Sequence, residues 1–239
     1  MLFMTLWKRI LPILIFIFFF HIIYLLYCKW FNPPITITQI SNLITCHEYK
    51  IKYINFYDVS PNGRLAVIAS EDQLFPEHNG FDWNSIHHAM AWNKNHPARI
   101  HGASTISQQT AKNIFLWQGG GWFRKGMEVY FTFMIELLYS KERILELYLN
   151  VTEMGPSLFG IECASETFFN HSAKNLTTAE AAMIAASLPN PHVYTVKPMS
   201  KFVQKRYPGI VNQMQRIRNR PDVSALLSKK PSSLKNIKY

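Results

Sequence analysis

Nineteen consecutive residues near the N-terminus, from Ile10 to Cys28, include no Lys, Arg, Asp or Glu. As an α-helix this stretch is about 28 Å long, close to the hydrocarbon thickness of a bilayer. A secretory signal peptide has a shorter apolar region followed by small residues, whereas Cys28-Lys29-Trp30-Phe31 follows here. The basic pair Lys8-Arg9 favours a cytoplasmic N-terminus. We therefore expect an uncleaved, single-pass transmembrane anchor in the cytoplasmic (inner) membrane, with the main body on the periplasmic or outer side.

The chain has 239 residues, enough for one domain of ordinary size with its own core. Its formal net charge of +10 suggests an anionic partner, which could be nucleic acid, phospholipid or a phosphorylated substrate. The three cysteines are an odd number and form no CxxC pair. They therefore indicate neither a disulfide framework nor a zinc site.

Caps and helix breakers divide the body of the chain into helices, so we expect a mainly α fold. Ser60-Pro61 predicts a helix start, and Thr177 to Glu180 form a capping box. Residues 127–138 are apolar on nearly every face and too short to span a membrane, which predicts a central buried helix. The other helices are expected from Ser60 to about Ser70, Asp82 to about Lys94, Ser104 or Thr105 to about Leu116, Ser140 to Asn150, and Gly160 to Phe169.

The residues between the anchor and the first of these helices read as a connector. Pro33-Pro34 breaks any helix, and residues 35–38 predict a short extended run. No alternating strand pattern is found after residue 40. The expected organisation is a cytoplasmic N-terminus (1–9), a transmembrane anchor (10–28), a linker (29–57), the main domain (58–196) and a basic C-terminal helix and tail (197–239).

An acidic stretch, residues 71–82, directly follows the apolar run 65–69. A helix through that run would place Glu71 at its end, where partial desolvation raises the pKa of a carboxyl group and makes it a usable general base or acid. The alternative is an acidic helix end followed by a solvated loop. The sequence around Glu71 does not by itself decide between the two.

No acidic residue lies between Asp82 and Glu128, whereas five Lys or Arg residues and four histidines do. This interval suits a phosphate or pyrophosphate, and the alternative is a solvated basic face. Its interleaved aromatic residues could lie at a lipid interface or stack on sugar rings. The segment from Lys197 onward is also basic, and could either contact anionic lipid or be solvated.

Metal, acyl-transfer and nucleic-acid interpretations have little support. The adjacent residues His87 and His88 point apart on a helix, and the chain contains no HExxH motif. The SxxK match at 232–235 lies in the basic tail without a KTG motif after it, which argues against a penicillin-type transpeptidase domain. The anchor and the lack of a recognisable binding motif disfavour nucleic acid.

Five segments, in order, resemble the signature motifs of the peptidoglycan glycosyltransferases, glycosyltransferase family 51. They are EDxxFxxHxGFD at 71–82, GASTISQQTAKN at 102–113, RKxxE at 124–128, ILExYLN at 144–150, and FGIExA with LPNP at 159–164 and 188–191. The resemblance covers roughly residues 55 to 195. The short chain with an anchor resembles the monofunctional members of the family, which have no transpeptidase activity.

The resemblance implies a lysozyme-like α fold and the polymerisation of lipid-linked disaccharide-pentapeptide into β-1,4 glycan strands for the cell wall. Undecaprenyl pyrophosphate would leave, and the anomeric carbon would be inverted. By the motif match, Glu71 is the base that takes the proton of the sugar 4-hydroxyl, and Glu128 is the second essential carboxylate. Glu128 would orient Arg124 or a divalent cation, Mg²⁺ or Mn²⁺, at the pyrophosphate. No resident metal or other cofactor is required.

The matched positions also imply a substrate-binding set: Asp72, Phe75, His78, Ser104, Gln108, Gln109, Lys112, Asn113 and Arg124. For Ser104, helix capping is an alternative role. The expected partners are the lipid-linked substrate, the growing glycan strand, the membrane and other cell-wall synthesis or division proteins. Two departures from the family pattern stand out: Gly102-Ala103 replaces the usual double glycine, and Gly119-Gly120-Gly121 lies where an Arg is common.

Two other functions compete with this interpretation. A lysozyme-like hydrolase would share the fold and one catalytic Glu, but it needs neither an anchor nor an acid-free cationic segment. A non-catalytic scaffold for wall-synthesis proteins would not need the set of Glu71, Lys112 and Arg124.

Overall fold

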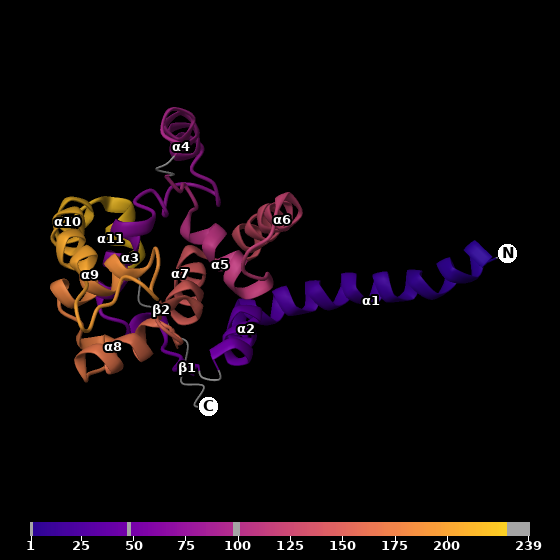
Figure 1. The fold of residues 1–239 in the computed structure, drawn as a ribbon, viewed down its shortest axis with the longest axis horizontal. Helices are drawn as coiled ribbons and strands as arrows, with labels where there is room; N and C mark the ends of the chain where they lie inside the picture. Colours follow the sequence, from indigo (N-terminus) through magenta and orange to yellow (C-terminus); the bar gives the residue numbers. More distant parts are fainter. Residues whose placement is uncertain (1, 47–48, 98–100, 229–239) are drawn as a thin grey trace.

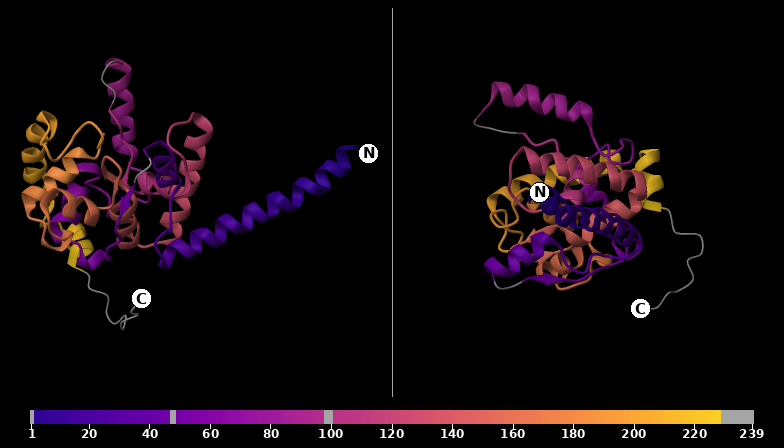
Figure 2. Two further views of the ribbon diagram at one scale, coloured as in Figure 1. Left: turned by 60° about the horizontal axis from the view of Figure 1, so that its bottom comes forward. Right: turned by 90° about the vertical axis from the view of Figure 1, so that its right-hand side faces the viewer.

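The computed structural model describes residues 2–46, 49–97 and 101–228. A helical body carries two projecting helices, α1 (Leu2–Trp30) and α4 (Trp83–Asn95), as Figures 1 and 2 show. The predicted mainly α fold is confirmed. Asp82 caps α4 through its side chain, as expected, but α4 buries none of its own residues.

Helix α1 is long and apolar enough, over Lys8–Trp30, to cross a membrane. Its C-terminal end is fixed to the body. Leu25 and Cys28 are fully buried, and their carbonyl oxygens accept hydrogen bonds from Tyr139 Oη and from the Arg143 guanidinium. The anchor therefore continues directly into the fold.

The connector after α1 contains a helix, α2 (Ile37–Cys46), where we expected an extended run. The extended prediction was wrong. The Thr36 hydroxyl oxygen accepts from the backbone N–H of Gln39, and the side-chain oxygen of Gln39 accepts from the backbone N–H of Thr36. This reciprocal pair is a capping box, and it outweighs the strand preference of the β-branched residues around it.

The centre of the body consists of helices whose N-caps were predicted from the sequence. Ser60, Thr105, Ser140 and Thr177 each accept a backbone N–H at the first turn of the helix that follows. These four helices are α3 (Pro61–Glu71), α5 (Ile106–Phe115), α7 (Lys141–Val151) and α9 (Thr178–Ser187). Helix α8 (Ile161–Phe169) follows Gly160 and has no side-chain cap. Thr105 rather than Ser104 caps α5, so the capping alternative for Ser104 is wrong.

Helix α6 (Trp122–Leu138) is not the central buried helix that we predicted. Only Glu128, Phe131, Thr132 and Ile135 are buried on it. Its outer face is apolar but exposed, and it lies beside α1 (Figure 1). Hydropathy alone cannot distinguish a core-facing side chain from an exposed apolar one, which explains the error.

A small sheet also escaped the sequence analysis. Strand β3 (Leu158–Phe159) pairs in parallel with β1 (Lys50–Ile51) and antiparallel with β2 (Glu153–Gly155), in the order β1-β3-β2. Strands of two or three residues are too short to show an alternating pattern. Two 3-10 helices lie at Phe56–Asp58, before α3, and at Ala173–Asn175, between α8 and α9.

The C-terminal helices belong to the body. Helix α10 (Lys201–Ile217) buries Val203, Ile210, Met214 and Ile217 against α3 and α9, and α11 (Pro221–Ser228) follows it. Helix α10 lies at the end of the body remote from α1 (Figure 1), and contact with lipid and solvation both remain possible for its basic face. Residues 229–239 of the predicted tail lie outside the described residues.

We predict that Gly160→Ala destabilises the protein by about 1–3 kcal/mol. Gly160 has φ +85°, and a Cβ at this position would lie 2.7 Å from the backbone oxygen of Asn150. Thermal unfolding of the detergent-solubilised protein measures the effect. The matched control is Gly209→Ala in α10, where no heavy atom lies within 4 Å of the added Cβ. Equal midpoints for the two variants would contradict the prediction.

Candidate active site

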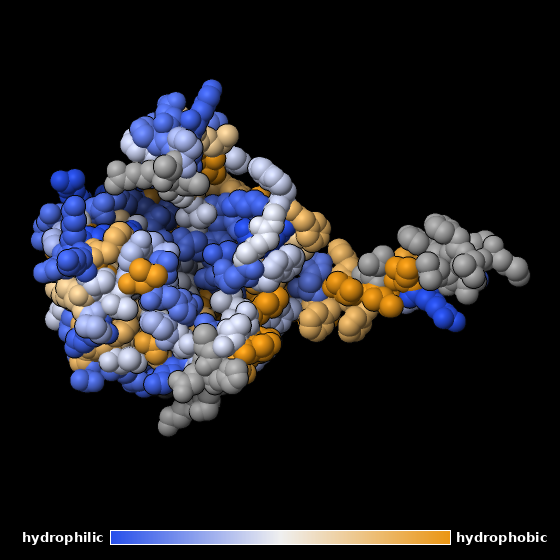
Figure 3. Space-filling view, in the orientation of Figure 1, coloured by the Kyte–Doolittle hydropathy of each residue, from blue (hydrophilic) through white to orange (hydrophobic). Residues whose placement is uncertain are grey.

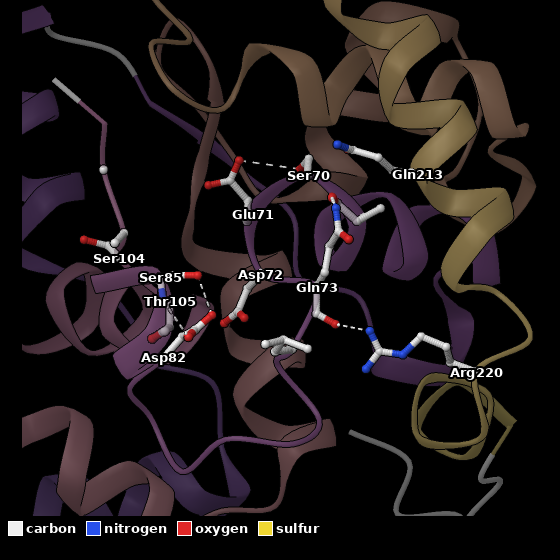
Figure 4. Close-up of a pocket in the computed structure, with 14 residues that line it drawn as sticks. Ser70, Glu71, Asp72, Gln73, Asp82, Ser85, Ser104, Thr105, Gln213 and Arg220 are labelled. Atoms are coloured by element: carbon white, nitrogen blue, oxygen red, sulfur yellow. Dashed lines mark hydrogen bonds between the residues drawn. The ribbon is translucent and has the colours of Figure 1, made fainter. Parts of the chain in front are cut away.

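A cleft with two pockets lies where α3, α5 and α6 meet the loop before α5. The larger pocket, of about 410 Å³, lies beside the end of α3 and is closed on the far side by Gln213 and Arg220 (Figure 4). The smaller pocket, of about 120 Å³, lies between α5 and α6. Ser104 lines both pockets, so they adjoin each other.

Glu71 is the last residue of α3, and its side chain is only 12% exposed. Gln109 Nε2 donates to Glu71 Oε2 at 2.9 Å, and an Arg206 nitrogen lies 3.8 Å from Oε1. Burial raises the pKa of Glu71 above its ordinary value and outweighs the lowering by Gln109 and Arg206. The burial of Glu71 therefore favours the partly desolvated carboxyl over the solvated helix end.

A chain of side-chain hydrogen bonds fixes the orientation of Gln109. The hydroxyl of the fully buried Tyr148 donates to Gln109 Oε1 at 3.2 Å, which leaves Gln109 Nε2 to face Glu71. One turn after Tyr148, the Thr152 hydroxyl accepts from Asn113 Nδ2 at 3.3 Å. The amide of Gln109 can therefore present only its N–H side to the carboxylate.

The smaller pocket holds an ion cluster around Glu128. Arg124 Nη1 donates to Glu128 Oε2 at 2.6 Å, and Lys125 Nζ contacts Oε1. Glu128 is 3% exposed. As predicted from their spacing, Arg124 and Glu128 share a face of α6. Arg124 Nε is buried without a hydrogen-bond partner among the described residues.

Lys112 lines the same pocket from α5. Burial lowers the pKa of Lys112 most, and the neighbouring cations Arg124 and Lys125 lower it further. The Glu128 carboxylate acts in the opposite direction and raises it. A partly buried ammonium beside two other cations favours an anionic ligand, because an added anion would relieve both the desolvation and the repulsion.

The structure gives Asp72 and His78 partners within the protein. Asp72 accepts the Ile106 N–H at 3.0 Å and the His78 Nε2–H at 2.9 Å, while His78 Nδ1 accepts the Gly80 N–H at 3.1 Å. Both ring nitrogens of His78 are thus used, which leaves none for a substrate. Asp72 still lines the larger pocket, but its carboxylate holds the N-terminus of α5 against the loop after α3.

Phe75 does not contact the cleft. Its side chain is 0% exposed and packs in the core with the Lys141 ammonium over its ring. The prediction that Phe75 contacts the substrate is therefore wrong for this structure. The motif match could not separate a residue that supports the loop from one that binds a ligand.

Three further predicted residues lie around the smaller pocket. Ser104 and Gln108 line it, with Gln108 Oε1 also accepting the Thr105 N–H in the capping box. Asn113 lines an adjacent pocket of about 250 Å³ together with Gln109 and Lys112. The structure therefore brings the predicted polar residues of α5 to one face of the cleft.

The described residues contain no group of protein ligands that would hold a divalent cation by itself. No group of three or more His, Cys, Asp or Glu side chains with metal-ligand geometry occurs among them. Glu128 is the only carboxylate that lines the smaller pocket, and both of its oxygens are paired with cations. We therefore derive no step through a metal.

Sequence reasoning missed three residues of the cleft. Arg206 reaches Glu71 from α10, and Tyr148 reaches Gln109 from α7. Lys125 joins the cluster at Glu128. The RKxxE motif already contained a signal for Lys125, whereas nothing in the local sequence links Arg206 to a carboxylate 135 positions earlier in the chain.

Comparison with known proteins identifies relatives of the whole domain. Residues 37–215 match the transglycosylase family. A biosynthetic peptidoglycan transglycosylase of Haemophilus influenzae is 47% identical over 216 residues, which cover 87% of this chain and 88% of the relative. A protein of the same name from Mannheimia succiniciproducens is 54% identical, and the match covers 70% of this chain and 69% of that relative. Another, from Pasteurella multocida, is 50% identical, and the match covers 73% of this chain and 70% of that relative.

We predict that Glu71→Gln stabilises the fold at pH 7. A raised pKa means that folding disfavours the ionised carboxylate, so ionised Glu71 lowers stability near neutral pH. The cost disappears as the pH falls below the ordinary pKa of a Glu, where both states are protonated. The expected rise in melting temperature is roughly 2–4 °C at pH 7, the shift that about 1 kcal/mol produces in a domain of this size.

The control for this measurement is Glu166→Gln, because Glu166 is 41% exposed and lies outside the cleft. The stability gain of Glu71→Gln should shrink as the pH is lowered, and Glu166→Gln should show no gain. A lower melting temperature for Glu71→Gln at pH 7 would show that its ionised form is stabilised by the fold.

Proposed function

The chain belongs to the transglycosylase family and is a peptidoglycan glycosyltransferase of cell-wall synthesis, and on this premise we propose that it polymerises lipid-linked disaccharide-pentapeptide with Glu71 as the general base. The observation that carries the proposal is the buried Glu71 carboxylate, held by Gln109 at the point where the two pockets adjoin. A base with a raised pKa accepts a proton more readily near neutral pH.

In this proposal, the acceptor sugar occupies the larger pocket with its 4-hydroxyl at Glu71. The carboxylate takes the hydroxyl proton while the oxygen attacks the anomeric carbon of the growing strand. The bond from that carbon to the pyrophosphate oxygen breaks, and its electron pair leaves with undecaprenyl pyrophosphate. Attack from the side opposite the leaving group inverts the anomeric carbon.

The smaller pocket suits the departing pyrophosphate. Arg124, Lys125 and Lys112 supply three positive charges against the single carboxylate of Glu128. Fixed cations that face developing negative charge stabilise a transition state without having to reorganise. The unpartnered Arg124 Nε is a further donor for a phosphate oxygen. Glu128 positions these cations and takes no part in proton transfer, and no resident metal ion is needed.

The anchor completes the proposal. Helix α1 would cross the cytoplasmic membrane once, with Lys8 and Arg9 on the inner side and the cleft on the outer side, where the lipid-linked substrate presents its sugars. Because the end of α1 packs directly on the body, the cleft would stay close to the membrane surface.

We predict that Glu71→Gln lowers the polymerisation rate roughly a hundredfold or more, the scale of a lost general base. The assay follows glycan strands made from lipid-linked disaccharide-pentapeptide by the solubilised full-length protein. The wild-type rate should fall on the acid side as Glu71 is protonated, at a pH above the ordinary pKa of a Glu, and on the alkaline side as Lys112 loses its proton, below the ordinary pKa of a Lys.

Glu77→Gln is the matched control, because Glu77 lies in the same acidic stretch but is 53% exposed and pairs with Arg220. It should leave the rate within about twofold, as expected for a surface carboxylate. Equal rates for Glu71→Gln and wild type would place the base elsewhere. Release of soluble fragments from finished glycan would instead indicate a hydrolase.

We predict that Tyr148→Phe moves the acid side of the pH–rate profile to higher pH. Without the hydroxyl, Gln109 can rotate its carbonyl oxygen toward Glu71, which removes a hydrogen bond that lowers the pKa of the carboxyl. A role for Tyr148 in packing alone would lower the rate at all pH values equally. Such a uniform loss would contradict the prediction, and a melting curve checks that the variant is folded.

A further inference from the structure

An apolar pocket of about 390 Å³ lies where α1 joins the body, outside the cleft described above. It is formed by four helices and the segment before α2, and its lining includes Tyr24, Ile40, Phe115 and Phe131. Figure 3 shows apolar residues at the junction of α1 with the body. An open pocket with this lining would be costly to leave in contact with water, so its chemistry favours an apolar occupant.

The pocket and the cation cluster share two helices. On α5, Phe115 follows Lys112 by three residues, and on α6, Phe131 follows Glu128 by three residues. Three residues advance about 4.5 Å along a helix and return to nearly the same face. The rings of Phe115 and Phe131 are stacked, with centroids 4.8 Å apart and planes 8° from parallel. The apolar pocket therefore begins one turn beyond the pyrophosphate pocket on both helices.

The pocket also lies at the level of the membrane. Its α1 residues, Phe20 to Tyr24, precede the end of that helix at Trp30 by six to ten residues, or roughly 9–15 Å. If α1 spans the bilayer, this depth lies within one hydrocarbon leaflet. A long apolar chain could thus enter the pocket from the bilayer without crossing water.

We propose that this pocket holds the polyprenyl chain of the lipid pyrophosphate whose head group lies at Lys112, Arg124 and Lys125. The inference rests on the proposed function, and it adds a second binding region that binds the lipid chain of the substrate instead of its sugars. A ligand with a pyrophosphate joined directly to a long branched hydrocarbon matches the order of the two pockets along α5 and α6. A phospholipid acyl chain is the competing occupant.

The test fills the pocket and compares two substrates. Ile40 lines it from α2 and is 41% exposed, so Ile40→Trp adds volume there without overpacking the core. For the substrate that carries an undecaprenyl chain, we expect KM to rise roughly tenfold, as when about two methylene groups lose apolar contacts. For the farnesyl-linked analogue, whose short chain makes fewer such contacts, KM should change much less.

The matched control is Ile44→Trp, which makes the same change on α2 at a residue that is 69% exposed and does not line the pocket. It should leave the preference for the longer chain intact. An unchanged preference in Ile40→Trp, or equal losses with both substrates, would overturn the proposal. The first result would place the chain elsewhere, and the second would give α2 only a structural role.

Photolabelling separates this proposal from the proposed function, because it needs no turnover. The wild-type protein in nanodiscs is treated with a long-chain polyprenyl diphosphate that carries a diazirine on its chain, and labelled peptides are mapped. We expect labels on the peptides that contain Ile40 or Phe115, removed by undecaprenyl pyrophosphate and not by added phospholipid. Displacement by phospholipid, or labelling confined to other helices, would overturn the pocket assignment. If the protein is labelled as expected but makes no glycan, the pocket assignment is supported and the proposed polymerase activity is rejected.

Discussion

The hydrogen bond from Gln109 to Glu71 is the interaction on which the candidate site depends. Glu71 is buried at the end of α3, and a buried carboxylate needs donors to remain ionisable. Gln109 supplies the shortest of its side-chain hydrogen bonds and is itself held by Tyr148. Three helices, α3, α5 and α7, must therefore keep their relative positions for the carboxylate to keep its proton affinity. The caps at Ser60, Thr105 and Ser140 set where each of these helices begins, and so support that geometry.

Features that depend on residues close together in the sequence could be predicted, whereas features that depend on distant residues could not. Caps and helix breakers act within one turn, so most helix boundaries were correct. The i,i+4 pair of Arg124 and Glu128 is equally local. Arg206 acts across the fold and left no local signal. Helix α6 was misassigned because its outward-facing residues, such as Phe133 and Leu137, are as apolar as a core.

The motif residues divide into two kinds that sequence reasoning treated alike. Gln109 and Lys112 line the cleft, whereas Phe75 and His78 lie behind it. The second kind still matters to the site, because Asp72 can hold the start of α5 only while His78 supports its carboxylate. A motif records the residues that a geometry needs, and many of those residues support the loop instead of binding the ligand.

The charge balance of the smaller pocket gives a physical reason for a carboxylate, Glu128, among the cations that we propose bind the leaving group. Without its carboxylate, Lys112, Arg124 and Lys125 would repel one another in a buried space, and the ammonium of Lys112 would lose its proton more easily. With it, the cations stay charged and fixed, and one charge is neutralised. An excess of two positive charges remains, enough to attract a pyrophosphate but weaker than three unpaired cations. In the proposed reaction, this weaker attraction would make release of the product lipid easier.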